Sequence, residues 1–385
     1  MRLHPLIVAA FLAAISSTTL RAGWSVSQIT DNDIDDDFAD ASAVLTNGQQ
    51  YVRDQRLAWR QVHAPNNVDI MTWFQGSSSL VHSEPRGVHQ LAMDWPLVVW
   101  ERSSSSPADG LTAWNGGTLH EVTEGYFWSS QLSASDGRVL YSTDIGAGEA
   151  SKAWVWDGSN HLLSFDPVNN SLTANIRGNF ATGTVGPVVK RWGPGGETTL
   201  DGGLGSNSNP FVLENGQAMW QGGTATSSEI FYHDGSSIER LTINAVEDVQ
   251  PVGDGRYIAW RVLDRPGGDL VLYDTVLETM TRLTNDDIAD DSLSLAGGRL
   301  VWRRGDTASG VIMLYDAALH QTSTLSDPLL NSKTPQIDDM TAHLIAWTAF
   351  DGNDWEVFVA TPEPSTALLL LAACAIRLCC RHQMV

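Results

Sequence analysis

Two stretches decide the fold of this 385-residue chain: RLTINAVEDVQPVGDGRYIAW (Arg240–Trp260) and RLTNDDIADDSLSLAGGRLVW (Arg282–Trp302). Each opens with a short strand pattern ending in Leu-Thr and closes on an apolar strand that ends in tryptophan, 18 residues after the threonine. Thr123 and Tyr141 have the same separation. Because equal spacing in several copies is hard to obtain by chance, the sequence predicts an internal repeat.

Strands that end in an aromatic residue recur along the whole chain with a period of about 41 residues. These anchors are Trp59, Trp100, Tyr141, Trp220, Trp260, Trp302 and Trp347. One step spans two periods, and GNFAT (Gly178–Thr182) stands where the missing copy is expected. Between anchors, apolar strands run into Asn115-Gly116, Asp157-Gly158 and Asp234-Gly235, dipeptides that signal type I′ hairpins.

Four short strands in each repeat are typical of a propeller blade. The sequence therefore predicts an all-β propeller of four-stranded blades over residues 23–360, with eight blades preferred and seven if GNFAT is not a blade. The last repeat lacks its outer strand, and WSVSQIT (Trp24–Thr30) matches that strand. We expect the N-terminal strand to pair into the last blade, because closure leaves no open sheet edge there. Thr30 and Trp59 are 29 residues apart instead of 18, which predicts an insertion of 11.

The repeats resemble those of TolB-type and WD-like propellers, most closely at Gln250-Pro251 and Asp254-Gly255-Arg256. The resemblance spans most of residues 24–360 and is architectural. Propellers of this kind include protein-binding scaffolds and enzymes. The resemblance therefore implies a fold but brings no catalytic residues with it.

The N-terminus predicts export. Residues 1–22 have a basic start at Arg2, an apolar run over Leu6–Ile15 and a small-residue cleavage site at Leu20-Arg21-Ala22, which is the layout of a secretory signal peptide. Near the other end, Ala367–Ile376 is an apolar run of ten residues, too short to cross a bilayer comfortably.

The C-terminal tail, residues 361–385, has a recognisable order: Pro362-Glu363-Pro364, an apolar run, then Arg377 and Arg381. This order resembles a PEP-CTERM sorting signal. The resemblance implies that an exosortase, a membrane-embedded transpeptidase-like protease, recognises and processes the tail after transient membrane anchoring. It also implies a place in the cell envelope or extracellular matrix of a Gram-negative bacterium, usually one that makes exopolysaccharide.

Charge and cysteine content exclude several classes of partner and site. The net charge is −22 and the chain has three lysines, so phosphate backbones would be repelled and nucleic acid is not expected as a partner. All three cysteines lie in the tail, and the propeller itself has neither a disulfide nor a thiolate metal site.

Two acidic segments follow Leu-Thr strands, or a close match to one, and should therefore lie on one face of the ring: TDNDIDDDFAD (Thr30–Asp40) and TNDDIADD (Thr284–Asp291). Aspartates at such places cap turns by accepting backbone N–H groups, and this is the interpretation that we prefer. Clustered carboxylates also suit Ca²⁺, although the residue order of an EF-hand is absent. The sequence predicts no cofactor, with Ca²⁺ as the one alternative. Its best ligands would be Asp31, Asp33, Asp35 and Asp37.

The tryptophans invite a sugar-binding interpretation, because flat rings stack on sugars. The periodic anchors are expected to pack between blades. Trp95 and Trp128 fall outside that period and are the better candidates for ligand contact. No metalloprotease helix motif and no nucleophile-elbow motif occurs in the chain.

These observations favour an exported, non-catalytic propeller of the cell surface or matrix that binds extracellular glycan or protein. Two alternatives stay open. One is an exported enzyme that acts on polysaccharide, either a lyase or a glycosidase with paired carboxylates. The other is a structural matrix protein without a specific ligand.

Overall fold

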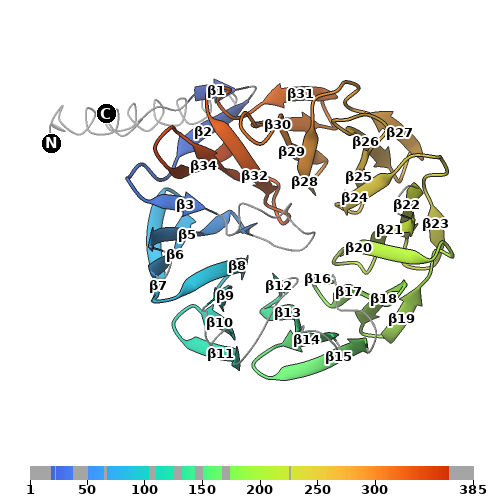
Figure 1. Ribbon diagram of the computed structural model, residues 1–385, viewed down its shortest axis with the longest axis horizontal. Coiled ribbons are helices and arrows are strands. Elements are labelled where there is room, and N and C mark those ends of the chain that lie inside the picture. Colours follow the sequence, from blue (N-terminus) through green and yellow to red (C-terminus); the bar gives the residue numbers. More distant parts are fainter. Residues whose placement is uncertain are drawn as a thin grey trace, which may run out of the picture.

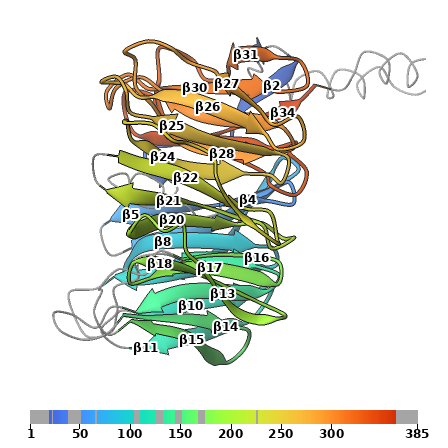
Figure 2. The same ribbon diagram turned by 90° about the vertical axis from the view of Figure 1, so that its right-hand side faces the viewer.

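Eight antiparallel sheets form a ring, seen face-on in Figure 1 and edge-on in Figure 2. The computed structural model describes residues 19–21, 23–37, 51–64, 67–103, 110–124, 132–143, 151–166, 174–224 and 227–363. Within these ranges every regular element is a strand, and no helix there could span a membrane. The ring is therefore an eight-bladed all-β propeller, as the repeat predicts.

The first half of the ring runs from blade 1 to blade 4. Blade 1 contains β3 (Asp35–Asp37), β4 (Val52–Arg53), β5 (Arg56–Ala64), β6 (Asn67–Phe74) and β7 (Ser77–Glu84). Blade 2 contains β8 (Gly87–Asp94), β9 (Leu97–Ser103), β10 (Gly110–Asn115) and β11 (Leu119–Glu124). Blade 3 contains β12 (Leu132–Ser135), β13 (Arg138–Thr143), β14 (Ser151–Trp156) and β15 (Asn160–Asp166). Blade 4 contains β16 (Ala174–Arg177), β17 (Phe180–Val185), β18 (Val188–Gly193) and β19 (Gly196–Leu200).

The second half runs from blade 5 to blade 8. Blade 5 contains β20 (Ser206–Val212), β21 (Ala218–Thr224), β22 (Ser227–His233) and β23 (Ile238–Arg240). Blade 6 contains β24 (Asp248–Gly253), β25 (Tyr257–Val262), β26 (Asp269–Asp274) and β27 (Thr279–Arg282). Blade 7 contains β28 (Asp290–Ala296), β29 (Arg299–Arg304), β30 (Val311–Asp316) and β31 (Gln321–Thr324). Blade 8 contains β32 (Asn331–Ile337), β33 (Ile345–Phe350), β34 (Trp355–Pro362), β2 (Trp24–Gln28) and β1 (Thr19–Arg21).

The GNFAT segment belongs to a real blade, so eight is the correct number. Its strand β17 pairs with β16 and β18 in the register of the other blades. Gly183 occupies the place of the aromatic anchor, because Ala181 pairs with Trp192 as Val139 pairs with Trp156 in blade 3, and the neighbouring Thr182 is fully buried. The Phe180 ring packs closely against Gly193 and Gly216, where an added Cβ would lie 2.5 Å and 2.8 Å from ring atoms. A nearby phenylalanine and small residues thus compensate for the missing anchor.

The ring closes through its two ends, as predicted. Strand β2 pairs antiparallel with β34, from Trp24 opposite Pro362 to Gln28 opposite Phe358 (Figure 1). The Val357 backbone N–H donates to the Thr30 hydroxyl at 2.9 Å, which continues the pairing past the end of β2. Blade 8 is therefore assembled from both ends of the propeller.

The predicted insertion is in the first strand of blade 1. Trp59 lies 23 residues after Asp36, whereas Trp260 lies 12 residues after Asp248. In blade 6 the first strand has a bulge, at which Gln250 takes a φ of 56°. In blade 1 two strands, β3 and β4, pair with β5 on either side of that position, and residues 38–50 lie between them in the sequence.

The hairpins form at the expected dipeptides but are not type I′ turns. Only the glycine takes a positive φ, for example 107° at Gly235. The aspartate before it acts as a cap, because Asp234 Oδ1 accepts the Ser236 and Ser237 backbone N–H groups, both at 2.7 Å. Side-chain capping by Asp or Asn therefore replaces the second left-handed residue.

The aromatic anchors form the core between blades, as predicted. The six anchor tryptophans are at most 1% exposed and lie in the second strands. In blades 6 and 1 an acid on the first strand of the same blade accepts the indole N–H: Asp248 from Trp260 at 2.9 Å and Asp36 from Trp59 at 2.8 Å. Burial raises the pKa of both carboxyls. Trp59 and Trp260 are thus fixed by a buried hydrogen bond as well as by packing.

Because the strands alternate in direction, the ring has two distinct faces. The loop face has the connections from second to third strand, such as residues 351–354, and those entering the next blade, such as 31–34 and 285–289. The turn face has the connections from first to second strand, such as residues 95–96, 254–256 and 338–344. These two names are kept below.

Candidate functional site

An acid at the start of the third strand recurs in three blades. It is Glu229 in blade 5, Asp269 in blade 6 and Glu356 in blade 8, each two ladder positions beyond the anchor tryptophan. All three are at most 1% exposed. Each accepts a backbone N–H from the loop that enters the next blade, and for Glu356 the donor is Asn32 at 3.0 Å.

A basic partner accompanies this acid in blades 5 and 6. Arg240 donates to Glu229 at 2.9 Å. Arg282, at the equivalent ladder position of the fourth strand, forms an ion pair with Asp269. The charge of each buried acid is therefore balanced within its own blade.

Blade 8 lacks that partner. The position of Arg240 and Arg282 falls on β2, where the residue is Gln28, opposite Phe358. No arginine, lysine or histidine of the described chain lies within ion-pair distance of Glu356. The acid at the ring closure is consequently buried without a balancing charge.

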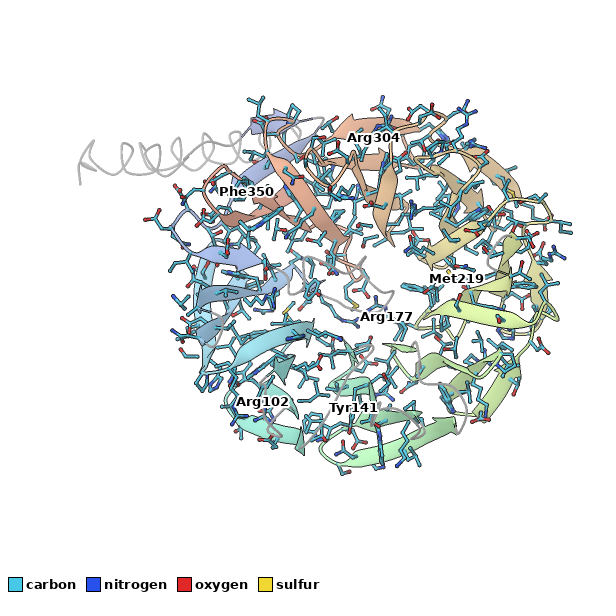
Figure 3. All side chains as sticks on the ribbon, viewed as in Figure 1. Arg102, Tyr141, Arg177, Met219, Arg304 and Phe350 are labelled. Carbon is cyan, nitrogen blue, oxygen red and sulfur yellow. The ribbon has the colours of Figure 1, made fainter. Side chains whose placement is uncertain are left out.

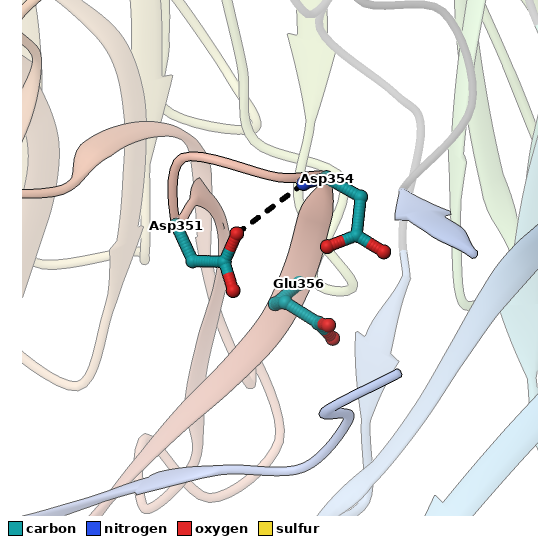
Figure 4. A group of neighbouring side chains, drawn as sticks. All are labelled: Asp351, Asp354 and Glu356. Carbon is teal, nitrogen blue, oxygen red and sulfur yellow. Dashed lines mark hydrogen bonds between the residues drawn. The ribbon is translucent and has the colours of Figure 1, made fainter. Parts of the chain in front are cut away.

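Two more carboxylates lie next to Glu356. Asp351 and Asp354, in the loop between β33 and β34, each place a carboxylate oxygen within 4.8 Å of the others and of Glu356. Figure 4 shows the three side chains pointing into a common space on the loop face. Asp351 is exposed, whereas Asp354 is 6% exposed and Glu356 is fully buried.

Several oxygens of this group have no hydrogen-bond donor. Both carboxylate oxygens of Asp354 are buried without a partner, and so is Oε2 of Glu356. Asp351 uses Oδ1 to cap its own loop, accepting the N–H groups of Asn353 at 2.8 Å and Asp354 at 3.2 Å. Buried acceptors without donors are costly, because their hydration is lost and nothing replaces it.

The N-terminal acidic segment reaches the same place. Asn353 Nδ2 donates to Asp33 at 3.4 Å, and the Trp355 backbone N–H donates to Asp35 at 3.2 Å. Asn32, whose N–H binds Glu356, has its own Oδ1 buried without a partner. Residues more than 300 positions apart in the sequence therefore build one acidic cluster, named here the closure cluster: Asp33, Asp35, Asp351, Asp354 and Glu356.

The electrostatics of the closure cluster disfavour the charged forms. Burial raises the pKa of Glu356 to about 7, with the charges of Asp354 and Asp36 adding to it. Burial also raises the pKa of Asp354, and the charges of Asp351, Asp35 and Asp33 add to that shift. Burial is the larger cause of both pKa shifts, and the neighbouring negative charges add to it.

The four predicted metal ligands divide into two groups. Asp33 and Asp35 are in the closure cluster, whereas Asp37 forms an ion pair with Arg60 and Asp31 is exposed. The three acids of DGNDWE (Asp351–Glu356) were missed by sequence reasoning. The density of acids in that short loop was the available signal.

The second acidic segment shows the capping that the preferred interpretation expects, because Asp286 Oδ1 accepts the Ile288 backbone N–H at 3.0 Å. Asp286 and Asp290 both bond to Arg304, and Asp291 bonds to Arg303 at 2.7 Å. The arginines of blade 7 thus neutralise this loop. Two segments of similar composition therefore differ in their local charge balance.

A second group of charged side chains fills the inner edge of the turn face. Arg53 forms ion pairs with Asp94 at 2.5 Å, Glu214 at 3.1 Å and Asp339 at 3.2 Å. Arg177 also pairs with Asp339, at 3.1 Å, and Figure 3 shows Arg177 at the centre of the ring. These five residues come from blades 1, 2, 4, 5 and 8, so the group, named here the hub, ties distant blades together.

Trp95 lies on the turn face, between β8 and β9. It is partly exposed and is preceded by the buried Asp94 of the hub. The Arg56 guanidinium lies 4.6 Å from its ring centroid and 3.8 Å from that of Phe74, and the Trp114 ring is 5.5 Å away. The structure thus places Trp95 in an aromatic surface with one cation. The other sequence candidate, Trp128, lies outside the described residues.

Only part of the predicted sorting motif lies within the described residues. Pro362 ends β34, and the Glu363 N–H donates to the Gly23 carbonyl at 2.9 Å. Pro364, Arg377 and Arg381 lie outside the described residues. The motif therefore begins directly at the ring closure.

Solved structures share this fold. An oligogalacturonate lyase in complex with manganese has a TM-score of 0.55 at 10% identity, covering 91% of this chain and 96% of that chain. The β-propeller domain of the trilobed protease from Pyrococcus furiosus, described as an open velcro topology, has a TM-score of 0.53 at 9% identity, covering 73% and 97%. TolB from Acinetobacter baumannii matches with a TM-score of 0.42 at 12% identity, covering 80% of each chain.

At these identities the first two likenesses support the propeller fold alone. No family model matches the sequence, and no curated protein is detectably similar to it. The pairing of β2 with β34 sets this chain apart from a propeller described as open.

Proposed function

We propose that this protein is an exported, non-catalytic propeller of the cell envelope or extracellular matrix of a Gram-negative bacterium, and that it binds glycan or protein. The observation that carries the proposal is the hub. Arg53 and Arg177 are at most 8% exposed and pair with acids from three other blades. The charged groups at the ring centre therefore form ion pairs with one another. Such a centre makes a rigid support for surface contacts.

The turn face offers a surface for contact with a glycan. Trp95, Phe74 and Trp114 are all partly exposed, and Arg56 lies against the first two rings. Aromatic rings provide flat apolar area, and a guanidinium provides donors for hydroxyl or carboxylate oxygens. We therefore assign glycan contact to this surface and leave a protein ligand as the second possibility.

Export and sorting complete the proposal. The first 22 residues act as a signal peptide, and the tail from Pro362-Glu363-Pro364 to Arg381 acts as a PEP-CTERM signal processed by an exosortase. The Glu363 N–H donates to the Gly23 carbonyl, so the tail starts at the ring closure. Mass spectrometry of the protein from its host would test processing: an intact tail on the mature protein contradicts it.

The experiment is a binding and degradation assay. The purified full chain is incubated with polysaccharide from an exopolysaccharide-producing host, and both retention and soluble fragments are followed. We expect saturable retention without fragments, weakened about tenfold by Trp95→Ala. Trp154→Ala, which removes a partly buried indole from blade 3, is the matched control and should bind normally.

The other outcomes separate the alternatives. Release of fragments would contradict the non-catalytic role and favour an enzyme that acts on polysaccharide. If the assay shows neither retention nor soluble fragments, glycan binding is contradicted. A protein ligand or a structural role then remains. If Trp95→Ala and Trp154→Ala weaken retention equally, the loss is not specific to Trp95, and the glycan contact does not lie there.

A further inference from the structure

We propose that the closure cluster is a Ca²⁺-binding site that fastens the N-terminal segment to the last blade. Its ligands are Asp351, Asp354 and Glu356, with Asp33 and Asp35 supplied by the segment that leads from β2 into blade 1. This inference concerns the loop face and does not depend on the glycan contact proposed for the turn face.

The first argument is the buried oxygens that lack donors. Asp354 is 6% exposed and neither of its carboxylate oxygens has a hydrogen-bond partner, and Glu356 is fully buried with Oε2 unpartnered. A folded chain keeps such groups ionised only if a cation balances them. All three unpartnered oxygens belong to residues whose carboxylates point into one space (Figure 4).

The second argument comes from the repeat itself. The acid at the position of Glu356 is neutralised by an arginine in blade 5 and in blade 6, and in blade 8 that arginine is replaced by Gln28. The charge missing from blade 8 would therefore be supplied from outside the chain. Lys333, the lysine of this blade, places its ammonium 3.4 Å from the centroid of the Trp355 ring, and no described ion pair joins it to the cluster acids.

The third argument is the kind and spacing of the donors. Carboxylate oxygens from Asp351, Asp354 and Glu356 lie within 4.8 Å of one another. Two ligand oxygens on opposite sides of a Ca²⁺ ion are about 4.6–5.2 Å apart, because each lies about 2.3–2.6 Å from the ion. The cluster has no nitrogen or sulfur donor, which disfavours zinc, and its high carboxylate count suits Ca²⁺ better than the strongly hydrated Mg²⁺.

A bound ion would act on the ring closure. Asp354 and Glu356 flank the start of β34, and Asp33 and Asp35 follow β2, its closing partner. An ion shared between these segments binds the closed ring and not the open one. Binding to the closed state alone shifts the equilibrium towards closure.

The experiment measures calcium binding and thermal stability of the purified full chain after removal of metal with a chelator. We expect one Ca²⁺ per chain with a dissociation constant of about 10⁻⁵–10⁻³ M, a range that ligand charge and rigidity set. We also expect a rise of several degrees in melting temperature with Ca²⁺, a much smaller rise with Mg²⁺, and slower proteolysis near β2.

The variants make the assignment specific. Asp354→Asn and Glu356→Gln should weaken Ca²⁺ binding at least about tenfold, because each removes one charged ligand. In chelator, both should melt at or above the wild-type temperature, since each removes a buried charge without a partner. The variants should thus melt at or above the wild-type temperature in chelator and below it in Ca²⁺. A purely structural role of these acids would not reverse the order of melting temperatures in this way. Asp306→Asn, in the equivalent loop of blade 7, is the matched control and should respond to Ca²⁺ as wild type does.

Three results would overturn the proposal. The first is the absence of Ca²⁺ binding by the wild-type chain. The second is an unchanged Ca²⁺ response in both Asp354→Asn and Glu356→Gln, which would place the ion elsewhere. The third is a rise in melting temperature with Mg²⁺ as large as the rise with Ca²⁺. If a buried variant does not fold, the exposed Asp351→Asn replaces it, and an unchanged response there counts against the site.

Discussion

Replacing Arg53 tests whether the hub stabilises the ring. Arg53→Met keeps the apolar stem and removes the guanidinium, which is bonded to Asp94, Glu214 and Asp339. Breaking a buried ion pair by removing one partner costs about 3–5 kcal/mol. Glu214 is 54% exposed and contributes little, and Asp94 still accepts the Gly137 N–H at 2.9 Å. We therefore expect the low end, about 3 kcal/mol.

The assay is reversible denaturation in urea, checked by thermal melting. For a propeller of about 340 residues, 3 kcal/mol corresponds to a fall of about 4 °C in melting temperature. Lys190→Met is the control, because it breaks a partly exposed pair with Glu197 and should cost at most about 1 kcal/mol.

A double-variant cycle identifies the source of the effect. Asp94→Asn added to Arg53→Met removes the carboxylate left without its partner, and it should recover part of the lost stability. The reasoning is refuted if Arg53→Met costs no more than Lys190→Met, or if adding Asp94→Asn lowers stability by its full single-variant amount.

Two further predictions concern the anchors and the closure cluster. Trp260→Phe should cost about 1–3 kcal/mol more than Trp347→Phe in urea denaturation, because Trp260 donates to Asp248 and the indole N–H of the equally buried Trp347 has no acceptor. Equal costs would show that the hydrogen bond contributes nothing. In chelator, the raised pKa of Glu356, about 7 against an ordinary 4.5, means that the folded state binds the proton more tightly. Glu356 therefore adds its full contribution to the free energy of unfolding at pH values below 4.5. That contribution should fall by about 3 kcal/mol as the pH rises from there through 7. Glu356→Gln should remove that fall, and a wild-type stability that rises over the same interval would contradict it.

Much of the fold was predictable because blades are local. Trp260 and Asp248 are 12 residues apart and lie on adjacent strands, so the spacing of the repeat already contains their contact. The closing strand was predictable for the same reason: Trp24–Gln28 supplies the element missing after Trp347. The type I′ turns were wrong in detail, because capping by Asp234 and its equivalents makes a second left-handed residue unnecessary.

The sites were predictable only in part. The acids of Thr30–Asp40 and Thr284–Asp291 look alike in the sequence, yet Arg303 and Arg304 neutralise the second segment, and among the residues that the structure describes no arginine pairs with Glu356. Which acids lack a counter-ion depends on the strand that lies alongside. For Glu356 that strand comes from the opposite end of the propeller.

By itself, the sequence determined the repeat, the closing strand and the position of the insertion, since each follows from strand order and spacing along one chain, whereas the pairing of β17 with its neighbours decided between seven blades and eight. Only the tertiary structure decided the hub and the closure cluster. Both join residues from distant blades, and their charge balance depends on neighbours that sequence separation does not reveal. Closing the ring brings Asp33 and Asp35 beside Asp354 and Glu356, and burial there turns ordinary surface acids into a group that needs a cation.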